Sequence, residues 1–210
     1  ASTRDIDEVG PYTWSMSPTV SMTYDLFSEV ACNTLGGQRI ALIHLNADNG
    51  YEIEEVMSEA VPALGGELVA IESFVSGQVR DFTSILHKVK ESDPDVVCVC
   101  SGYADAASIV IQSDQVDLDA QFLLSTENYC QEFIDAVGDT DKEVYVASIF
   151  SAQALDENVQ TFVQKYEEAY GSTPSQFASD PYAAACLFIS AMEQGATDRE
   201  SLYQVLSEMT

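Results

Sequence analysis

Apolar residues along this chain gather in short continuous runs, with helical patterns of apolar and polar positions between them. The runs have the length of buried strands and lie at 39–45, 67–74, 95–100, 121–124 and 143–149. Helical spacing recurs at 20–35, 51–64, 82–91, 105–116 and 130–137. Alternation of strand and helix is typical of βαβ units, so the pattern predicts an α/β fold, a parallel sheet flanked by helices.

The alternation stops after Ile149. Two further helices are expected over 158–170 and 182–194, and no apolar run follows them. The first of these helices has an apolar stripe made of Val159, Phe162, Val163, Tyr166 and Tyr170. These helices have faces to bury but no strands of their own. We therefore expect one lobe at 19–150, with 1–18 and 151–210 as parts of a second.

The helices of 158–194 need a partner for their apolar faces. They could fold back onto the 19–150 lobe, pair with a second copy of the chain, or pack against another segment. The sheet of the 19–150 lobe already has helices enough for both faces. The pattern therefore favours a dimer or a partner segment.

The composition is that of a globular protein with an unusual charge. Hydrophobic residues make up 46% of the 210, enough for a full core, while 35 acidic against 8 basic residues give a formal charge of −27. Such a field repels phosphate backbones and anionic lipid heads, which disfavours nucleic acid and membrane surfaces as partners. Cationic and zwitterionic ligands remain open, as does a simple solvated acidic surface.

The chain as given has neither an 18-residue apolar run nor a basic segment followed by an apolar one. It therefore predicts no transmembrane helix and no signal peptide, as expected of a mature or trimmed chain. Five cysteines without CxxC spacing argue against both a zinc ribbon and a disulfide framework. Cys98 and Cys100, two apart in one strand, are interpreted as small buried residues.

Motifs for catalysis are missing from the sequence. His44 and His87 have no metal-ligand spacing with another histidine or cysteine, and there is no GxSxG elbow, P-loop or GxGxxG after a strand. The sequence therefore predicts no enzyme, no metal and no cofactor, and a structural role for both histidines.

Polar residues follow three of the predicted strands at the point where each ends. Asn49 follows the first run, Tyr103 in Ser-Gly-Tyr follows the third, and Glu127 in Ser-Thr-Glu-Asn follows the fourth. Strand carboxyl ends are where open α/β sheets bind ligands. An amide, an aromatic ring and an acid suit a small zwitterion, because the acid neutralises an ammonium and the ring covers apolar surface. Taken alone, each of these residues is more often a cap, a turn residue or core filler.

Several segments in the same order resemble the type I periplasmic binding proteins, above all the leucine/isoleucine/valine-binding components of ABC importers. They are RIALIHLNADNGYEIEE, Arg80-Asp81-Phe82, Asp93-Pro94-Asp95-Val96-Val97, Gly102-Tyr103, Gly138-Asp139, and FVQKYEEAYG with the helix led by Tyr182. The resemblance covers the whole chain but only the middle of a family member. It lacks the first half of the amino-terminal lobe and the final return segment, which would explain the helices without strands.

The resemblance implies two α/β lobes, joined by a hinge, that close on an amino acid. Residues 19–150 would be the carboxy-terminal lobe, and 1–18 with 151–210 would belong to the amino-terminal one. By position, Glu127 matches the acid that receives the ligand ammonium, Tyr103 a pocket tyrosine, and Ser2 a small hydroxyl residue that binds the ligand. Where the family commonly has an aromatic residue before glycine, this chain has Asn49, so the aromatic wall is replaced by an amide or supplied by Tyr51.

Together these features predict a non-enzymatic solute-binding protein of an ABC importer. It would capture a branched-chain or similar amino acid outside the cell or in the periplasm and hand it to a membrane permease. Its precursor would have a signal peptide, with a lipid anchor as a further possibility. The alternative is a ligand-binding sensor domain of the same fold in a signalling receptor.

Overall fold

The computed structural model describes residues 9–209, which divide into two compact units. One unit is Val20–Ser148, called the sheet unit below, and the other combines Ala1–Thr19 with Ile149–Thr210, called the helical unit. The assignment of these units to the carboxy-terminal and amino-terminal lobes of a binding protein stays a prediction. In residues 9–209 no helix has both the length and the apolar character needed to cross a membrane.

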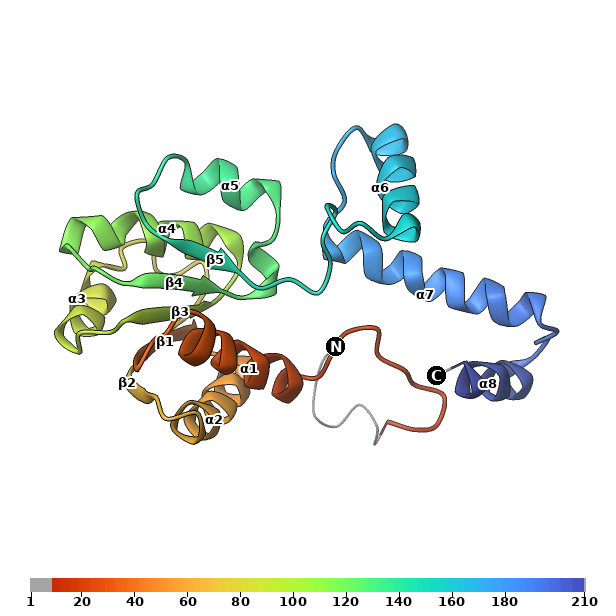
Figure 1. Cartoon of the computed structure of the whole chain (residues 1–210), viewed down its shortest axis with the longest axis horizontal. Coiled ribbons are helices and arrows are strands. Elements are labelled where there is room, and N and C mark those ends of the chain that lie inside the picture. The colour runs from red at the N-terminus through yellow and green to blue at the C-terminus, as the bar shows by residue number, and fades with distance from the viewer. Residues whose placement is uncertain (1–8, 210) are drawn as a thin grey trace. The chain divides into compact units, whose positions relative to one another are not determined.

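The sheet unit is built on five parallel strands, so the predicted fold class is confirmed (Figure 1). The strands are β1 (Arg39–Leu45), β2 (Glu67–Phe74), β3 (Val96–Cys100), β4 (Gln121–Leu124) and β5 (Val144–Val146), in the spatial order β2-β1-β3-β4-β5. Each lies within a predicted apolar run. β5 is shorter than the predicted 143–149 because its partner β4 has four residues, and the last pair is Leu124 with Val146.

Helices cover both faces of this sheet (Figure 1). One face packs against α1 (Val20–Glu29) and α2 (Asp48–Ala63), and the other against α3 (Thr83–Glu91), α4 (Tyr103–Ser113) and α5 (Gln131–Val137). Alternate β1 residues explain this. Ile40 and Leu42 lie in the first core, Ala41 and Ile43 in the second, and all four are fully buried.

Several helix boundaries in the sheet unit differ from the sequence prediction. The helix expected over 20–35 changes after Glu29 into a π-helix, Val30–Thr34. The helix expected at 51–64 begins at Asp48, so Asn49 and Gly50 lie in its first turn rather than in a loop, and the helix expected at 105–116 begins at Tyr103. The predicted burial of Cys98 and Cys100 is confirmed, and none of the five cysteines forms a disulfide in the described part of the chain.

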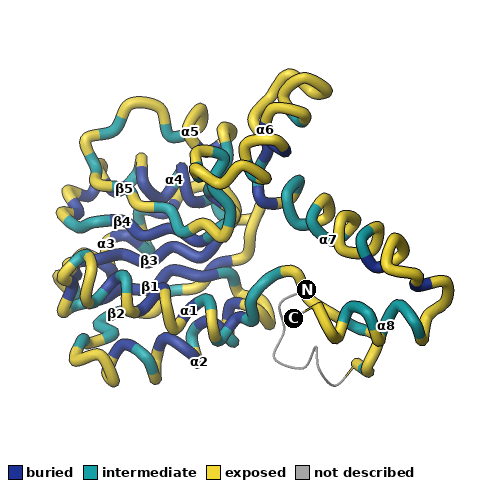
Figure 2. Tube along the Cα trace, turned by 45° about the vertical axis from the view of Figure 1, so that its right-hand side comes forward, coloured by how far each residue is buried: buried dark blue, intermediate teal, exposed yellow. Residues whose placement is uncertain are grey.

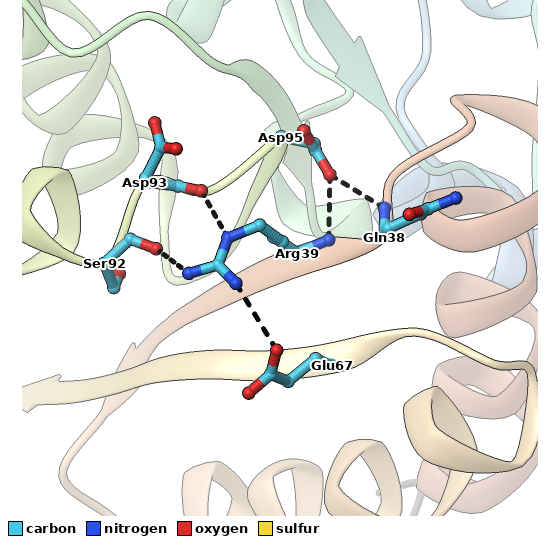
Figure 3. Close-up of polar contacts among 6 residues, drawn as sticks. All are labelled: Gln38, Arg39, Glu67, Ser92, Asp93 and Asp95. Atoms are coloured by element: carbon cyan, nitrogen blue, oxygen red, sulfur yellow. Dashed lines mark hydrogen bonds and ion pairs between the residues drawn. The ribbon is translucent and has the colours of Figure 1, made fainter.

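A polar cluster fastens the amino-terminal edge of the sheet (Figure 3). The Arg39 guanidinium donates to the backbone oxygens of Asp93 at 2.9 Å and Ser92 at 2.6 Å, and pairs with Glu67 at 3.4 Å. The Asp95 carboxylate accepts from the backbone N–H groups of Gln38 and Arg39, each at 2.8 Å. These contacts join the starts of β1, β2 and β3.

The described part of the helical unit contains three helices and no strand. They are α6 (Glu157–Tyr170), α7 (Gln176–Glu193) and α8 (Arg199–Glu208). α7 begins at Gln176 rather than at the predicted 182, so that Pro181 lies inside it, and α8 was not predicted. Phe162 of α6 stacks on Tyr182 of α7 with ring centroids 4.6 Å apart. In Figure 2 the central strands β1, β3 and β4 are largely buried, the outer strands β2 and β5 are less so, and α7 is largely exposed.

Candidate functional site

The carboxyl edge of the sheet brings the predicted strand-end residues to one side of the molecule. β1, β3 and β4 are neighbours and run in the same direction, so the segments that follow them share one edge. Asn49 lies in the first turn of α2, Tyr103 begins α4, and Glu127 lies in the 3-10 turn Thr126–Asn128. Their side chains have no hydrogen bond to one another in the described structure.

The first turn of α2 packs closely against the end of β1. A Cβ at Gly50 would overlap the carbonyl oxygen of Leu45 and lie 2.6 Å from His44 Nδ1, so the glycine allows this approach. Tyr51 is half exposed, donates from its hydroxyl to Asn46 Oδ1 at 2.7 Å, and meets the His44 ring edge to face. Asn49 is exposed as well, so both side chains at the end of β1 are accessible.

His44 lies beneath this turn and has a structural environment. Its side chain is buried, with Nδ1 2.9 Å from the oxygen of Leu45 and Nε2 3.2 Å from Glu54 Oε2. His87 is exposed on α3. Among residues 9–209 no group of three or more histidine, cysteine or acidic residues is placed to hold a metal.

Tyr103 stands at the amino terminus of α4, after Gly102. About two fifths of Tyr103 is exposed, so part of its side chain is accessible at the edge. Asp105 in the same turn accepts a hydrogen bond of 2.5 Å from Ser76 Oγ, which ties the segment after β2 to α4. The Tyr103 side chain is thus partly accessible on an anchored helix start.

Glu127 is exposed, and a buried phenol and thiol lie near it. Burial is the main cause that raises the pKa of Tyr24, with added contributions from the Cys100 thiol and the Glu127 carboxylate. Burial likewise raises the pKa of Cys100, so both groups are neutral at pH 7. The negative charge of this part of the edge therefore belongs to Glu127.

The segments after the strands carry more acid than base. In 46–51, 75–82, 101–105 and 125–130 the carboxylates are Asp48, Asp81, Asp105 and Glu127, and the cation is Arg80. Acceptors in excess of donors favour a ligand that brings a positive charge or N–H donors.

Two buried polar residues at this edge were missed by the sequence analysis. The Nδ2 of Asn128 bonds to the backbone oxygens of Ser101 and Ser125, while Asn128 Oδ1 and Ser101 Oγ are buried without a hydrogen-bond partner in the described structure. No local pattern predicts a bond across 27 residues. Ser2, the remaining predicted site residue, lies outside the described residues.

Comparison with known proteins gives a family and a set of similar structures. A family model described as "Periplasmic binding protein" matches residues 1–210. No curated protein matches the sequence.

Three solved structures illustrate the similarity in fold. An ABC transporter substrate-binding protein from Sphaerobacter thermophilus has 20% identity and a TM-score of 0.84, over 97% of this chain and 57% of its own. A branched-chain amino acid substrate binding protein from Streptococcus pneumoniae, in complex with isoleucine, has 25% identity and a TM-score of 0.79, over 91% and 55%. A solute binding protein from R. palustris, in complex with benzoate, has 17% identity and a TM-score of 0.80, over 94% and 55%. The chain spans about 55–57% of the length of these three structures.

Proposed function

Because this chain belongs to the family of periplasmic binding proteins, we propose that it is the substrate-binding part of an ABC importer. It acts in the periplasm or outside the cell, captures an amino acid between two lobes and delivers it to a membrane permease. It performs no chemistry on the ligand. The sheet unit is the carboxy-terminal lobe, and the helical unit contributes to the amino-terminal one.

The observation that carries the proposal is the set of side chains on neighbouring strand ends. Glu127 offers a carboxylate for the ligand ammonium, Tyr103 offers a partly accessible aromatic side chain, and Asn49 with Tyr51 forms the wall at the end of β1. Ligands of open α/β sheets bind at this edge. The excess of carboxylates there supports a ligand with an ammonium group.

An amino acid is a better ligand for this edge than an aromatic acid. Benzoate, the ligand of one similar structure, has no cation for Glu127 and would meet an edge with four carboxylates and one cation. Isoleucine, the ligand of another, has an ammonium for the acid and an apolar side chain for the rings. We therefore propose that the ligand is a branched-chain or similar small amino acid.

Titration calorimetry of the intact protein tests the proposal with isoleucine, leucine, valine and benzoate. We expect saturable binding of at least one amino acid and none of benzoate. Amino-acid esters, which keep the ammonium but lose the carboxylate charge, and N-acetyl amino acids, which lose the ammonium charge, separate the two ends of the ligand. Binding of benzoate in preference to every amino acid would contradict the proposed ligand class.

A further inference from the structure

We propose that Asn128 is the positioning residue of the ligand site, because its amide holds together the two segments that carry Tyr103 and Glu127. The inference rests on the proposed function for the meaning of those two side chains. The hydrogen bonds of Asn128 are observed whether or not the proposed function is correct.

The Asn128 amide group bridges the carboxyl ends of β3 and β4. Nδ2 donates at 3.0 Å to the backbone oxygen of Ser101 and at 3.0 Å to that of Ser125, and lies 3.3 Å from Ser125 Oγ. Ser101 directly follows β3, and Ser125 directly follows β4. The amide thus links the two segments just beyond the strands that they extend.

The orientation of the amide follows from its partners. Both backbone oxygens can only accept, so the donor Nδ2 must face them and Oδ1 must face away. The backbone bond from Ser125 N to the oxygen of Val99, 3.0 Å long, is the last one between these strands. Asn128 therefore supplies the next link, at the place where the ladder stops and the site begins.

Burial makes this link rigid, but it also lowers stability by leaving one polar atom of the amide unpaired. Asn128 is 1% exposed, and its Oδ1 has no hydrogen-bond partner in the described structure. An unpaired buried acceptor lowers stability, and an apolar residue at this position would avoid that loss. Packing of the core therefore does not explain why the residue is an amide. The two donated bonds explain it, because they require an NH₂ group.

The link acts on both ends of the site. Glu127 is the residue before Asn128, and Tyr103 is the second residue after Ser101. A change in the Asn128 bridge therefore shifts the acid relative to the ring, although Asn128 itself is buried. Small displacements of binding groups weaken binding strongly when the geometry is preorganised.

Substitution by aspartate gives a readout that depends on pH. In Asn128→Asp the carboxylate faces two backbone oxygens and cannot donate, so we expect at least tenfold weaker binding of isoleucine at pH 7.5. Burial and the two acceptors favour the protonated acid, whose O–H can donate to one of these oxygens. The ratio of variant to wild-type affinity should therefore recover as the pH falls toward 5, whereas in Asn128→Ala it should be low and independent of pH.

Asn33→Asp is the matched control, because it adds the same charge at an exposed position in the sheet unit. It should bind isoleucine as the wild type does throughout this pH range. Wild-type affinity in Asn128→Asp at pH 7.5, or a loss that does not recover at low pH, would overturn the proposal.

Hydrogen exchange tests the bridge without a ligand. The backbone N–H of Ser125 donates to the oxygen of Val99 at 3.0 Å, and that of Ala106 donates to the oxygen of Gly102 at 3.1 Å, so both amides are protected at the two ends of the bridge. In Asn128→Ala these two amides should exchange faster than in the wild type, while those of β1 should not change. Unchanged exchange at both positions would overturn the proposal as well. If the wild type binds none of the amino acids, the proposed function fails, and hydrogen exchange still decides the role of Asn128.

Discussion

The sheet unit and the helical unit contain similar apolar patterns but bury them to different extents. All five residues of β3 are buried, and apolar side chains on both faces of the sheet lie beneath helices. In α7, which has 18 residues, Gln176 and Ala191 are buried, and in α8 no residue is. An amphipathic helix forms a core only when a second layer covers its apolar face, and the described helical unit has no sheet to do so.

The largest expected effect of this difference is on the state of association. Phe177, Ile189 and Met192 on α7 are each more than half exposed. We expect the 210-residue chain to associate in solution and to bind a hydrophobic dye, as measured by light scattering and fluorescence. Val20–Ser148 alone, the control, should be a monomer without dye binding. A monomeric 210-residue chain that binds no dye would show that the exposed faces need no partner.

Truncation of one phenylalanine in each unit measures how much the core of that unit contributes to its stability. Phe122 of β4 is fully buried in the sheet core, so Phe122→Ala should destabilise the sheet unit by about 3–5 kcal/mol. Phe162 is buried as well but packs mainly on aromatic rings of a much smaller core, and Phe162→Ala should lower the stability of the helical unit by less than Phe122→Ala lowers that of the sheet unit. Denaturant unfolding followed by circular dichroism gives both values. Equal losses would mean that both cores are equally developed.

A pair of glycines tests how tightly each unit is packed. Gly50→Ala should destabilise the sheet unit by about 3 kcal/mol, because its Cβ would overlap the Leu45 carbonyl and crowd His44. Gly171 ends α6 with φ 71° and has open space around its Cβ position. Gly171→Ala should therefore give only the backbone strain of about 1 kcal/mol. The same denaturant titration measures both, and a mild effect of Gly50→Ala would show that α2 can shift away from β1.

The charge of Glu127 in the sheet unit is expected to contribute to ligand binding. In Glu127→Gln a charge-assisted hydrogen bond to the ligand ammonium becomes a neutral one, and amino-acid binding by the intact protein should weaken by about 1.5–3 kcal/mol. Calorimetric titration of both forms measures this. Asp117→Asn, a change of the same type beyond the far end of α4, should leave the affinity unchanged. Unchanged affinity in Glu127→Gln would leave Glu127 with the role of a turn residue.

The smallest expected effect is the acid sensitivity of α8. Asp198 Oδ1 accepts from the backbone N–H of Ser201 at 2.9 Å and from its hydroxyl at 2.7 Å, and these bonds lower the pKa of the carboxyl below its usual 3.8. A lowered folded-state pKa gives stability that is present above 3.8 and is lost as the pH falls through the lower value. Helicity followed by circular dichroism should therefore decrease below about pH 3.8, and less so in Asp198→Asn. If the wild type and Asp198→Asn lose helicity at the same pH, the Asp198 cap does not stabilise α8.

The sequence predicted the parallel sheet because its strands are continuous runs of branched apolar residues, such as Val96 and Val97, which few other structures accommodate. It misplaced the start of α2 because Asn49-Gly50 has the composition of a turn. The reason for Gly50 is tertiary, since the Leu45 carbonyl occupies the space of a side chain. α8 was missed although Asp198 and Ser201 have the spacing of a capping box.

The candidate site was predictable in part for a similar reason. Residues that directly follow strands, such as Tyr103 and Glu127, are found by counting along the chain, and the parallel topology then places them on one edge. Asn128 could not be found in this way, because its importance depends on the Ser101 oxygen, which only the folded sheet brings to it. Whether the predicted residues bind a ligand stays a prediction.

The outer strands of the sheet also bear on how this protein avoids aggregation. β2 lies at one edge and exposes a row of backbone groups to which a foreign strand could add. Glu67 is exposed at the start of this strand, and Glu72 further along it pairs with Lys88 at 2.8 Å. The other edge, β5, has only three residues. A second sheet approaching either side would meet charge or too short a template, so these two features protect the folded sheet from edge-to-edge polymerisation.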